Sequence, residues 1–375
     1  MLMAKHLCPT SSSRLTIDLG AIRDNYRLIA ARIAPAMCSA VVKADAYGLG
    51  AARVAPMLRD AGCGIFFVAQ LGEAIALREA LGAGSEILIL NGVDPGGERL
   101  CADRGLIPVL NSLSQVERWR TLARERGAAL PAALQVDSGM SRLGLDARSV
   151  ATLADDAAFP REVSLRLLMT HLACADAPGN SANEAQLARF ALARARFPGV
   201  PASIANSGGS FLPEEFHCDV ARPGIALYGV APSALAEGLR PVATLAARVI
   251  QIREIEAGTG VGYGLDYIAS ERRRLATVGI GYADGWPRHL SNVGAVWHQG
   301  TRLPITGRVS MDSLTVDISA LPDEALAEGD FVELLGPSQT LDDVAGEAGT
   351  IAYEILTQLG RRHERRYVDG AQICA

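Results

Sequence analysis

The sequence has very little lysine, because arginine supplies 34 of its 36 basic residues. A bias of this strength is typical of a genome's coding preference and is not a functional signal by itself. It makes Lys43 unusual, since this lysine ends an apolar run within AVVKADAYGLG. Arginine keeps its proton at any biological pH, whereas a lysine amine deprotonated by burial can attack a carbonyl and form a Schiff base. The alternative interpretation is a strand-end lysine whose stem lies on apolar surface while its amine stays in water.

Patterns for disulfides and metals are also missing. The cysteines are odd in number, scattered and without a CxxC pair, which indicates free thiols in a reducing compartment. The six histidines never fall into HxH or HExxH spacing, so we expect no metal site. The seven cysteines are Cys8, Cys38, Cys63, Cys101, Cys174, Cys218 and Cys374.

Long hydrophobic runs are absent as well. No 18 apolar residues follow one another, and the first residues, MLMAKHLCPTSSSR, contain no sustained apolar stretch. We therefore expect neither a membrane span nor an export signal, and a cytoplasmic location. The net charge is −5, and the arginines are dispersed beside acidic residues, so no nucleic-acid footprint is visible. The expected substrate is a small molecule.

What the sequence does contain, between residues 37 and 229, is an alternation of short apolar runs with longer segments of helical period. The helical segments, such as SQVERWRTLARERG, end in Gly or Pro-Gly. Eight such units predict an α/β barrel with eight parallel strands. An open doubly wound sheet has the same local pattern, and the count of eight decides between the two. The predicted strands are residues 37–43, 65–69, 87–90, 107–110, 132–137, 164–170, 202–206 and 225–229.

After Pro241 the sequence changes to Val, Ile and Thr alternation broken by glycines, as in RRLATVGIGYADG. This pattern predicts a second, mainly β domain, and a chain of 375 residues is long enough for two domains. The segment RLTIDLG near the start supplies one strand more than the barrel needs, so we expect it to join the β domain. The predicted boundaries are residues 15–238 for the barrel and 239–375, with an N-terminal strand in 1–14, for the β domain.

Polar residues follow or close the predicted barrel strands, where the active sites of such barrels lie. One or two polar residues at such positions have no special meaning, but five of the strands carry them. They are Lys43 at the first strand, Arg142 after the fifth, His171 after the sixth, Asn206 and Ser207 after the seventh, and Arg222 at the last.

Two glycine-containing loops, NSGGS and RPGI, predict anion sites, because small residues let backbone N–H groups approach a phosphate closely. Ordinary turns are the alternative for either loop alone. The string GTGVGYGLDY is not a dinucleotide loop, since strand-like sequence follows it instead of a helix. A reactive lysine together with a phosphate cradle indicates pyridoxal phosphate as cofactor.

The ordered motifs VVKADAYG, VDSGMSRLG, THLACAD, ANSGG, RPGIALYG, VGYG, GYADGWPR, GRVSMD and GTIAYEI resemble those of the alanine racemase family. The resemblance runs from Leu15 to Tyr367. It implies an N-terminal β/α barrel followed by a β domain, and a homodimer whose active sites take residues from both subunits. It also implies interconversion of L- and D-alanine, which supplies D-alanine for peptidoglycan or degrades it.

The resemblance implies a role for each matching residue. Lys43 would hold the cofactor and act as base on one face of the substrate, and Tyr263 of the other subunit would act on the opposite face. A tyrosine base needs help because its ordinary pKa is about 10, and His171 with Arg222 resembles the pair that provides it. Arg222 also resembles the partner of the pyridine nitrogen, a cationic donor that favours proton transfer over transamination and decarboxylation.

Further residues match binding positions of the family. The cofactor would meet Tyr47, Asn206, Ser207, Arg222, Gly224, Ile225 and Tyr353. The substrate carboxylate would meet Arg142 and the backbone N–H of Met311. A narrow access path that favours small amino acids would be lined by Tyr282, Arg288, Arg308, Asp176 and Ile351.

One position departs from the family. Many members carry a carbamylated lysine seven residues before the arginine of the GMxR motif, and this chain has Gln135 there. A neutral amide accepts a hydrogen bond from Arg142 but does not neutralise it, so chloride could substitute. Two other functions stay open: an amino-acid racemase of broader specificity, for example for serine, and a pyridoxal phosphate-binding barrel without racemase activity. Proteins of the latter kind look like the barrel alone, and the β domain argues against that function.

Overall fold

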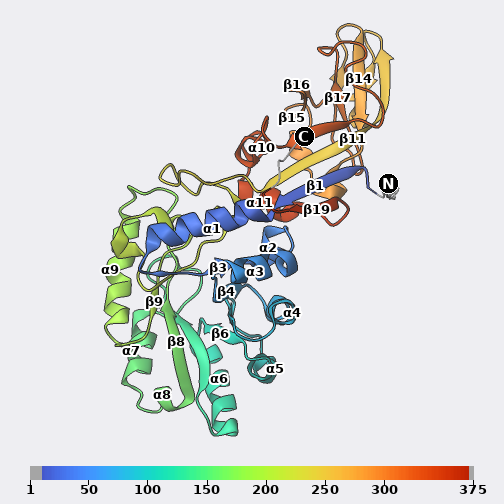
Figure 1. Cartoon of the computed structure of the whole chain (residues 1–375). Coiled ribbons are helices and arrows are strands. Elements are labelled where there is room, and N and C mark those ends of the chain that lie inside the picture. Colours follow the sequence, from blue (N-terminus) through green and yellow to red (C-terminus); the bar gives the residue numbers. More distant parts are fainter. Residues whose placement is uncertain (1–10, 371–375) are drawn as a thin grey trace. The chain divides into compact units, whose positions relative to one another are not determined.

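The computed structural model describes residues 11–370, which form two compact units. One consists of residues 21–241, and the other joins residues 11–20 to residues 242–370 (Figure 1). The first ten residues and the last five, with Cys8 and Cys374, lie outside this range. Within it, no helix is long and apolar enough to cross a membrane.

The unit of residues 21–241 is a parallel barrel with its helices outside the strands (Figure 1). Most residues of its strands are buried, as expected where helices cover one face and the barrel interior the other; exposed residues occur in β2 (Met37–Cys38) and in the first half of β8 (Val163–Met169). Seven strands form one continuous parallel sheet, in the order β3 (Ala40–Val41), β4 (Ile65–Val68), β5 (Glu86–Ile89), β6 (Ile107–Leu110), β7 (Leu130–Gln135), β8 (Val163–Met169) and β9 (Ala202–Ser203).

The ring is closed by β10 (Val220–Ala221), which pairs in parallel with β2 (Met37–Cys38). On one side of β10, the N–H groups of residues 219 and 222 donate to the carbonyls of Ala202, in β9, and Ala205, just after it. On the other side, the N–H groups of Ser39 and Val41 donate to the carbonyls of residues 221 and 223. The sequence-predicted barrel is therefore confirmed as a closed parallel arrangement.

The predicted eighth strand, residues 225–229, is wrong. Those residues form a buried 3-10 turn, η3 (Ile225–Tyr228), and the strand is the shorter β10 before it. Pro223 has no N–H to donate to a ladder, and Gly224 turns the chain with φ −123° and ψ −89°. A short apolar run such as IALY fits a strand or a buried helical turn equally well from its sequence.

The helices of this unit begin and end at residues that suit these positions. The Ser112 and Asp146 side chains accept N–H groups at the starts of α6 and α7, and Gly127 ends α6 in the left-handed conformation. The helices are α1 (Leu19–Ile33), α3 (Ala51–Asp60), α4 (Leu71–Leu81), α5 (Glu98–Asp103), α6 (Leu113–Arg126), α7 (Ala147–Asp155), α8 (Phe159–Glu162) and α9 (Ala182–Arg194), with short turns α2 (Lys43–Tyr47), η1 (Gly209–Phe211) and η2 (Glu214–Phe216).

The other unit is mainly β, and its sheet includes the strand near the N-terminus. This strand, β1 (Ser13–Asp18), pairs antiparallel with β11 (Ala243–Ile255) and parallel with β19 (Glu364–Val368). The predicted boundary at residue 15 would cut β1, whereas the compact units divide at residues 20/21 and 241/242, because β1 completes this sheet.

The remaining elements of the β unit are further strands of this sheet, a separate two-stranded sheet of β12 and β13, and short helices and turns. The strand order is β16-β15-β18-β11-β1-β19, and β14 joins β11 to β17. These elements are β12 (Gly260–Val261), β13 (Tyr267–Ile268), β14 (Arg273–Val278), β15 (Ala295–His298), β16 (Thr301–Pro304), β17 (Leu314–Asp317), β18 (Phe331–Leu335), α10 (Leu341–Ala348), α11 (Ala352–Gln358), η4 (Tyr263–Leu265), η5 (Tyr282–Asp284) and η6 (Arg288–Leu290).

Candidate active site

Lys43 stands at the start of a left-handed turn just after β3. The four residues that follow it have φ angles from 52° to 55° although none of them is glycine. L-residues pay about 1–2 kcal/mol each for this conformation, and such strain is concentrated at functional sites. At the far end of the turn, Asp45 Oδ1 accepts the N–H of Ala51 at 2.8 Å, and Gly48 N–H donates to Ala44 O at 2.7 Å. Specific hydrogen bonds thus hold this left-handed turn at the rim of the barrel.

The environment of Lys43 favours the reactive form of its amine. Burial lowers the pKa of Lys43, the positive charge of Arg142 lowers it further, and the carboxylate of Glu73 opposes both. A lower pKa leaves more of the amine unprotonated, which is the form that attacks a carbonyl or accepts a proton. The snorkelling alternative for this lysine does not fit a largely buried amine.

An anion cradle lies in the loops after β9 and β10. Ser207 Oγ accepts the N–H of Gly224 at 2.8 Å and that of Ala226 at 3.3 Å, which leaves the hydroxyl proton available to donate. Ser207 and Ile225 are both buried, and within residues 11–370 neither backbone N–H has a hydrogen-bond acceptor. Buried N–H groups need an acceptor, which a phosphate oxygen supplies. The N–H of Gly224, also predicted to bind phosphate, is already used by Ser207.

Close packing explains the glycine at position 224. A Cβ there would lie 2.3 Å from the hydroxyl oxygen of Tyr47. The Tyr47 ring packs against that of Tyr228, with 4.8 Å between ring centroids, and Tyr228 Oη donates to Val41 O at 3.0 Å. The loops that follow three strands, β3, β9 and β10, therefore bring together the predicted phosphate ligands Tyr47, Ser207, Gly224 and Ile225.

Arg222 is a buried cation whose hydrogen-bond partners are neutral. Its Nη2 donates to Thr170 O at 2.6 Å, its Nη1 donates to the hydroxyl of Ser203, and Nη2 lies 3.5 Å from Nδ1 of His171. Burial lowers the pKa of Arg222 to about 10, which still leaves it charged at neutral pH. A buried charge without an anionic partner is costly, so this position fits an acceptor atom of a ligand.

His171 is held neutral by its surroundings. Burial lowers its pKa to about 3, helped by the charges of Arg222, Arg142 and Lys43. The side-chain nitrogen of Asn206 lies 3.5 Å from His171 Nε2, and it donates to Leu172 O at 3.3 Å. These mutual effects show that the structure brings the predicted residues Lys43, Arg142, His171 and Arg222 to one end of the barrel.

The loop after β7 that carries Arg142 is held by hydrogen bonds between the Asp137 side chain and the loop's own backbone. Asp137 Oδ1 accepts three successive N–H groups, those of residues 139, 140 and 141, at 2.9–3.1 Å. Buried Gln135 donates from Nε2 to Leu143 O at 3.3 Å, so the observed partner of its amide is backbone beside Arg142 and not the guanidinium itself. Arg142 is exposed at the mouth.

Gln186 on α9 is a structural residue of the site that the sequence interpretation missed. Its Nε2 donates to His171 O at 2.9 Å and to Ser138 Oγ at 3.2 Å, and its Oε1 accepts the N–H of Ala173 at 2.8 Å. One buried amide therefore joins the loops after β7 and β8. The sequence does hold a signal for this role. Two amide residues, Asn183 and Gln186, lie three positions apart in an Ala- and Arg-rich helix, on the face that is buried.

The other predicted residues lie in the β unit. Tyr263 begins η4, and its side chain is 71% exposed. Arg308 forms an ion pair with Asp266, with Nη2 at 3.0 Å from Oδ1, and this pair packs beside Gly264 in the same turn. The phenol of Tyr263 is thus exposed, and the turn that carries it packs against an ion pair.

Tyr282 and Met311 sit on two loops that are tied together. The N–H groups of residues 282 and 283 donate to Ser310 O and Met311 O at 3.0 Å. A Cβ on Gly281 would lie 2.3 Å from Ser310 O, so only glycine allows this approach. Met311 is exposed, and no acceptor for its N–H lies among the residues that the structure describes.

A network of charged side chains connects these two loops to the segment that contains Arg362. Buried Asp284 accepts the N–H of Gly281 at 2.9 Å, and its Oδ1 lies 3.1 Å from Arg362 Nε. Arg362 also donates to Asp312 at 2.7 Å. This network was not predicted from the sequence.

The predicted access residues are only partly brought together. Tyr282 and Arg288 line one hollow of the β unit with Thr350 and Glu354. Ile351, which is exposed, precedes α11, and Tyr353 lies within that helix. Asp176 is exposed in the barrel unit, after β8.

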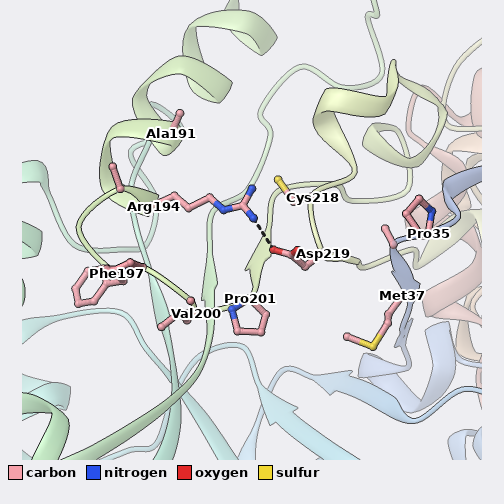
Figure 2. Close-up of a pocket in the computed structure, with 13 residues that line it drawn as sticks. Pro35, Met37, Ala191, Arg194, Phe197, Val200, Pro201, Cys218 and Asp219 are labelled. Carbon is pink, nitrogen blue, oxygen red and sulfur yellow. Dashed lines mark hydrogen bonds and ion pairs between the residues drawn. The ribbon is translucent and has the colours of Figure 1, made fainter.

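Another hollow, of about 740 Å³, lies at the opposite ends of the barrel strands (Figure 2). It is lined by Met37, which begins β2, by Pro201, which precedes β9, and by Asp219, which precedes β10. Arg194 and Asp219 form an ion pair of 2.9 Å on its wall. Active sites of such barrels lie at the carboxyl ends of the strands, so this hollow is not the candidate site.

Known proteins similar to this chain agree with the geometry. Two family models match it: "Alanine racemase, N-terminal domain" over residues 17–232 and "Alanine racemase, C-terminal domain" over residues 242–367. The alanine racemase of Brucella canis is 51% identical over 368 residues, which cover 94% of this chain and 93% of that protein. The catabolic alanine racemase of Mesorhizobium japonicum is 53% identical over 357 residues, covering 95% and 93%.

A solved structure is similar over the same length. The alanine racemase from Bartonella henselae with covalently bound pyridoxal phosphate superposes with a TM-score of 0.92 at 45% identity, covering 96% of this chain and 100% of that one. A barrel with a lysine of lowered pKa and an anion cradle at its rim, followed by a β domain, agrees with the class that these matches show, the pyridoxal phosphate-dependent isomerases. The chain belongs to the alanine racemase family.

Proposed function

We propose that this protein interconverts L-alanine and D-alanine, with Lys43 and Tyr263 as bases on opposite faces of Cα. The observation that carries the proposal is a half-buried lysine of lowered pKa on the same barrel rim as an anion cradle and a buried arginine. Pyridoxal phosphate, when bound, supplies an electron sink that makes the Cα–H of an amino acid acidic. Ser207, Ile225 and Tyr47 would hold its phosphate.

Racemisation needs two bases, because a proton leaves one face of Cα and returns on the other. Lys43, as a largely buried amine, holds or releases a proton on its own face. The exposed phenol of Tyr263, from a second copy of the chain, does so on the opposite face. Each base serves as acid in the reverse direction.

His171 and Arg222 support the tyrosine through a defined tautomer. We infer that Arg222, which is always a donor, takes Nδ1 as its acceptor and leaves the proton on Nε2, and that the Asn206 amide, 3.5 Å from Nε2, keeps its hydrogen bond to Leu172 O. A neutral His171 then donates from Nε2 toward a phenolate oxygen and favours its charged form. Arg222, the partner proposed for the ring nitrogen, cannot accept a proton, which favours proton transfer at Cα over other reactions of the cofactor.

Arg142 and the N–H of Met311 would bind the substrate carboxylate, since a guanidinium and a backbone donor without an acceptor both suit an anion. Arg142 reaches the site from the barrel of one copy and Met311 from the β unit of the other.

A homodimer is part of the proposal. Large apolar side chains cluster by sequence around the proposed functional positions of the β unit and are exposed in the single chain. A second copy would cover them. They are Tyr263, Leu265, Ile268, Met311 and Ile351. The scattered free thiols of the described cysteines support a cytoplasmic location.

A broader racemase is the second candidate, because Gln135 changes the support of Arg142. An enantiomer-resolved assay with alanine and serine, with and without added pyridoxal phosphate, separates these functions. We expect cofactor-dependent racemisation of alanine. Equal kcat/KM for serine would favour the broader enzyme, and cofactor binding without racemisation of either amino acid would overturn the proposed function.

A further inference from the structure

The carboxylate of Glu73 joins two segments of the barrel rim. Its Oε1 accepts the N–H of Ala44, the residue directly after Lys43, at 2.7 Å. Its Oε2 accepts the N–H groups of Ala69 and Gln70 at 2.7 and 3.1 Å. Both oxygens are therefore committed to backbone donors, one on the turn after β3 and two on the connection between β4 and α4.

The position of Glu73 makes it a strong anchor. It is the third residue of the 11-residue helix α4, where the helix dipole favours an ionised carboxylate. Hydrogen bonds to an ionised acceptor are stronger than those between neutral groups. The Ala44 N–H belongs to the first residue of the left-handed turn, a conformation that L-residues leave unless their surroundings hold it.

Two reactive or binding side chains depend on this turn. Lys43 precedes it, and Tyr47, a predicted ligand of the cofactor phosphate, is its last non-glycine residue. A relaxed backbone at Ala44 would change the direction of both side chains. Asp45 holds the far end of the turn through Ala51, so Glu73 is the anchor at the near end.

We propose that Glu73 is a positioning residue, which fixes the left-handed turn after Lys43 and so aims the Lys43 amine and the Tyr47 hydroxyl at the cofactor. This inference rests on the proposed role of Lys43. Glu73 touches neither substrate nor reacting atoms; its charge raises the pKa of Lys43, and its positioning effect acts through the backbone of Ala44.

The test compares Glu73→Gln, Glu73→Ala and Glu73→Asp with the wild type. Glutamine has one acceptor oxygen, so it satisfies only one of the two segments, and alanine satisfies neither. Aspartate keeps the charge on a shorter stem. The matched control is Glu79→Gln on the same helix, whose exposed carboxylate lies 3.6 Å from Arg104 and far from the turn in sequence.

Four quantities are measured: the dissociation constant of pyridoxal phosphate, the fraction of protein in which borohydride links the cofactor to Lys43, and kcat and KM for alanine. For Glu73→Ala we expect cofactor binding about tenfold weaker, the change that corresponds to losing one charge-assisted hydrogen bond. We also expect a smaller linked fraction and a lower kcat with little change in KM. Glu73→Gln should fall between alanine and wild type, and Glu79→Gln should match the wild type.

Some outcomes would overturn the inference. If the Glu73 variants unfold at lower temperature but bind and link the cofactor as the wild type does, Glu73 is no more than a helix cap. If Glu73→Ala fails to fold, the Glu73→Gln and Glu73→Asp measurements decide by the same criterion. Linkage of the wild-type cofactor to a residue other than Lys43 would overturn this inference and the proposed function together, whereas normal linkage in every variant would overturn this inference alone.

Discussion

Arg222 Nη2 lies 3.5 Å from Nδ1 of His171 and 2.6 Å from the carbonyl oxygen of Thr170, the residue just before that histidine. One buried guanidinium therefore contacts both the backbone of the loop after β8 and the imidazole ring that the loop carries. The side-chain nitrogen of Asn206, which is also a donor, lies 3.5 Å from Nε2, so each ring nitrogen of His171 faces a donor. The position of His171 is thus fixed in part by a residue that follows a strand two places away.

Lys43→Ala should remove the absorbance of the covalently linked cofactor, because no other side chain on the barrel rim is proposed to hold it. The measurement is the visible spectrum of the variant incubated with pyridoxal phosphate, followed by borohydride reduction. Retention of a reducible, protein-linked cofactor would show that another residue holds it.

Tyr263→Phe should affect the two enantiomers unequally, since it removes the base on one face of Cα and leaves Lys43 on the other. We expect exchange of the Cα proton for deuterium to slow far more with L-alanine than with D-alanine. Tyr267→Phe, in the neighbouring β13, is the control and should exchange both enantiomers normally. Equal losses for both enantiomers with Tyr263→Phe would refute the two-base mechanism.

His171 should make the fold less stable in acid. Its pKa is about 3 in the folded protein and about 6.5 when unfolded, so between these values the unfolded chain binds an extra proton. Stability from this residue is fully present above pH 6.5 and falls as the pH decreases toward 3, by at most about 1.4 kcal/mol per pH unit. The free energy of unfolding can be measured with urea on the cofactor-free protein at several pH values. It should fall less steeply with decreasing pH in His171→Gln than in the wild type. Identical slopes in the two proteins would contradict the lowered pKa.

Activity should not depend on carbon dioxide, because Gln135 cannot be carbamylated and its amide holds Leu143 O beside Arg142. We expect KM for alanine to be unaffected by removing bicarbonate and to respond to chloride if an anion balances Arg142. Rescue of a depleted sample by bicarbonate alone would count against this role of Gln135.

Arg362→Ala should raise KM for alanine and lower stability, because it leaves the buried carboxylate of Asp284 without its cation and loosens the Tyr282 and Met311 loops. An uncompensated buried carboxylate costs about 1–3 kcal/mol or more. Arg361→Ala, at the neighbouring exposed arginine, is the matched control. A KM equal to that of the control would show that the network has no part in substrate binding.

The sequence predicted most of the fold because barrel strands and helices differ in hydrophobic period. It failed at residues 225–229, where an apolar run too short to show a period follows Pro223 and Gly224. The strand-end residues Lys43, His171 and Arg222 could be found because polar side chains after buried runs stand out. Glu73 and Gln186 could not, since each also bonds to backbone groups of segments distant in the sequence, which leave no mark in it.

The pairing of β1 has a consequence for how the chain folds during its synthesis. A ribosome releases β1 first, but both of its partner strands, β11 and β19, are made after the whole barrel. Domains generally fold as their residues emerge. The barrel of residues 21–241 can therefore close while the backbone N–H and C=O groups of β1 are still unpaired. This order favours a short and partly polar first strand, and SRLTID, with alternating buried and half-buried residues, meets that requirement.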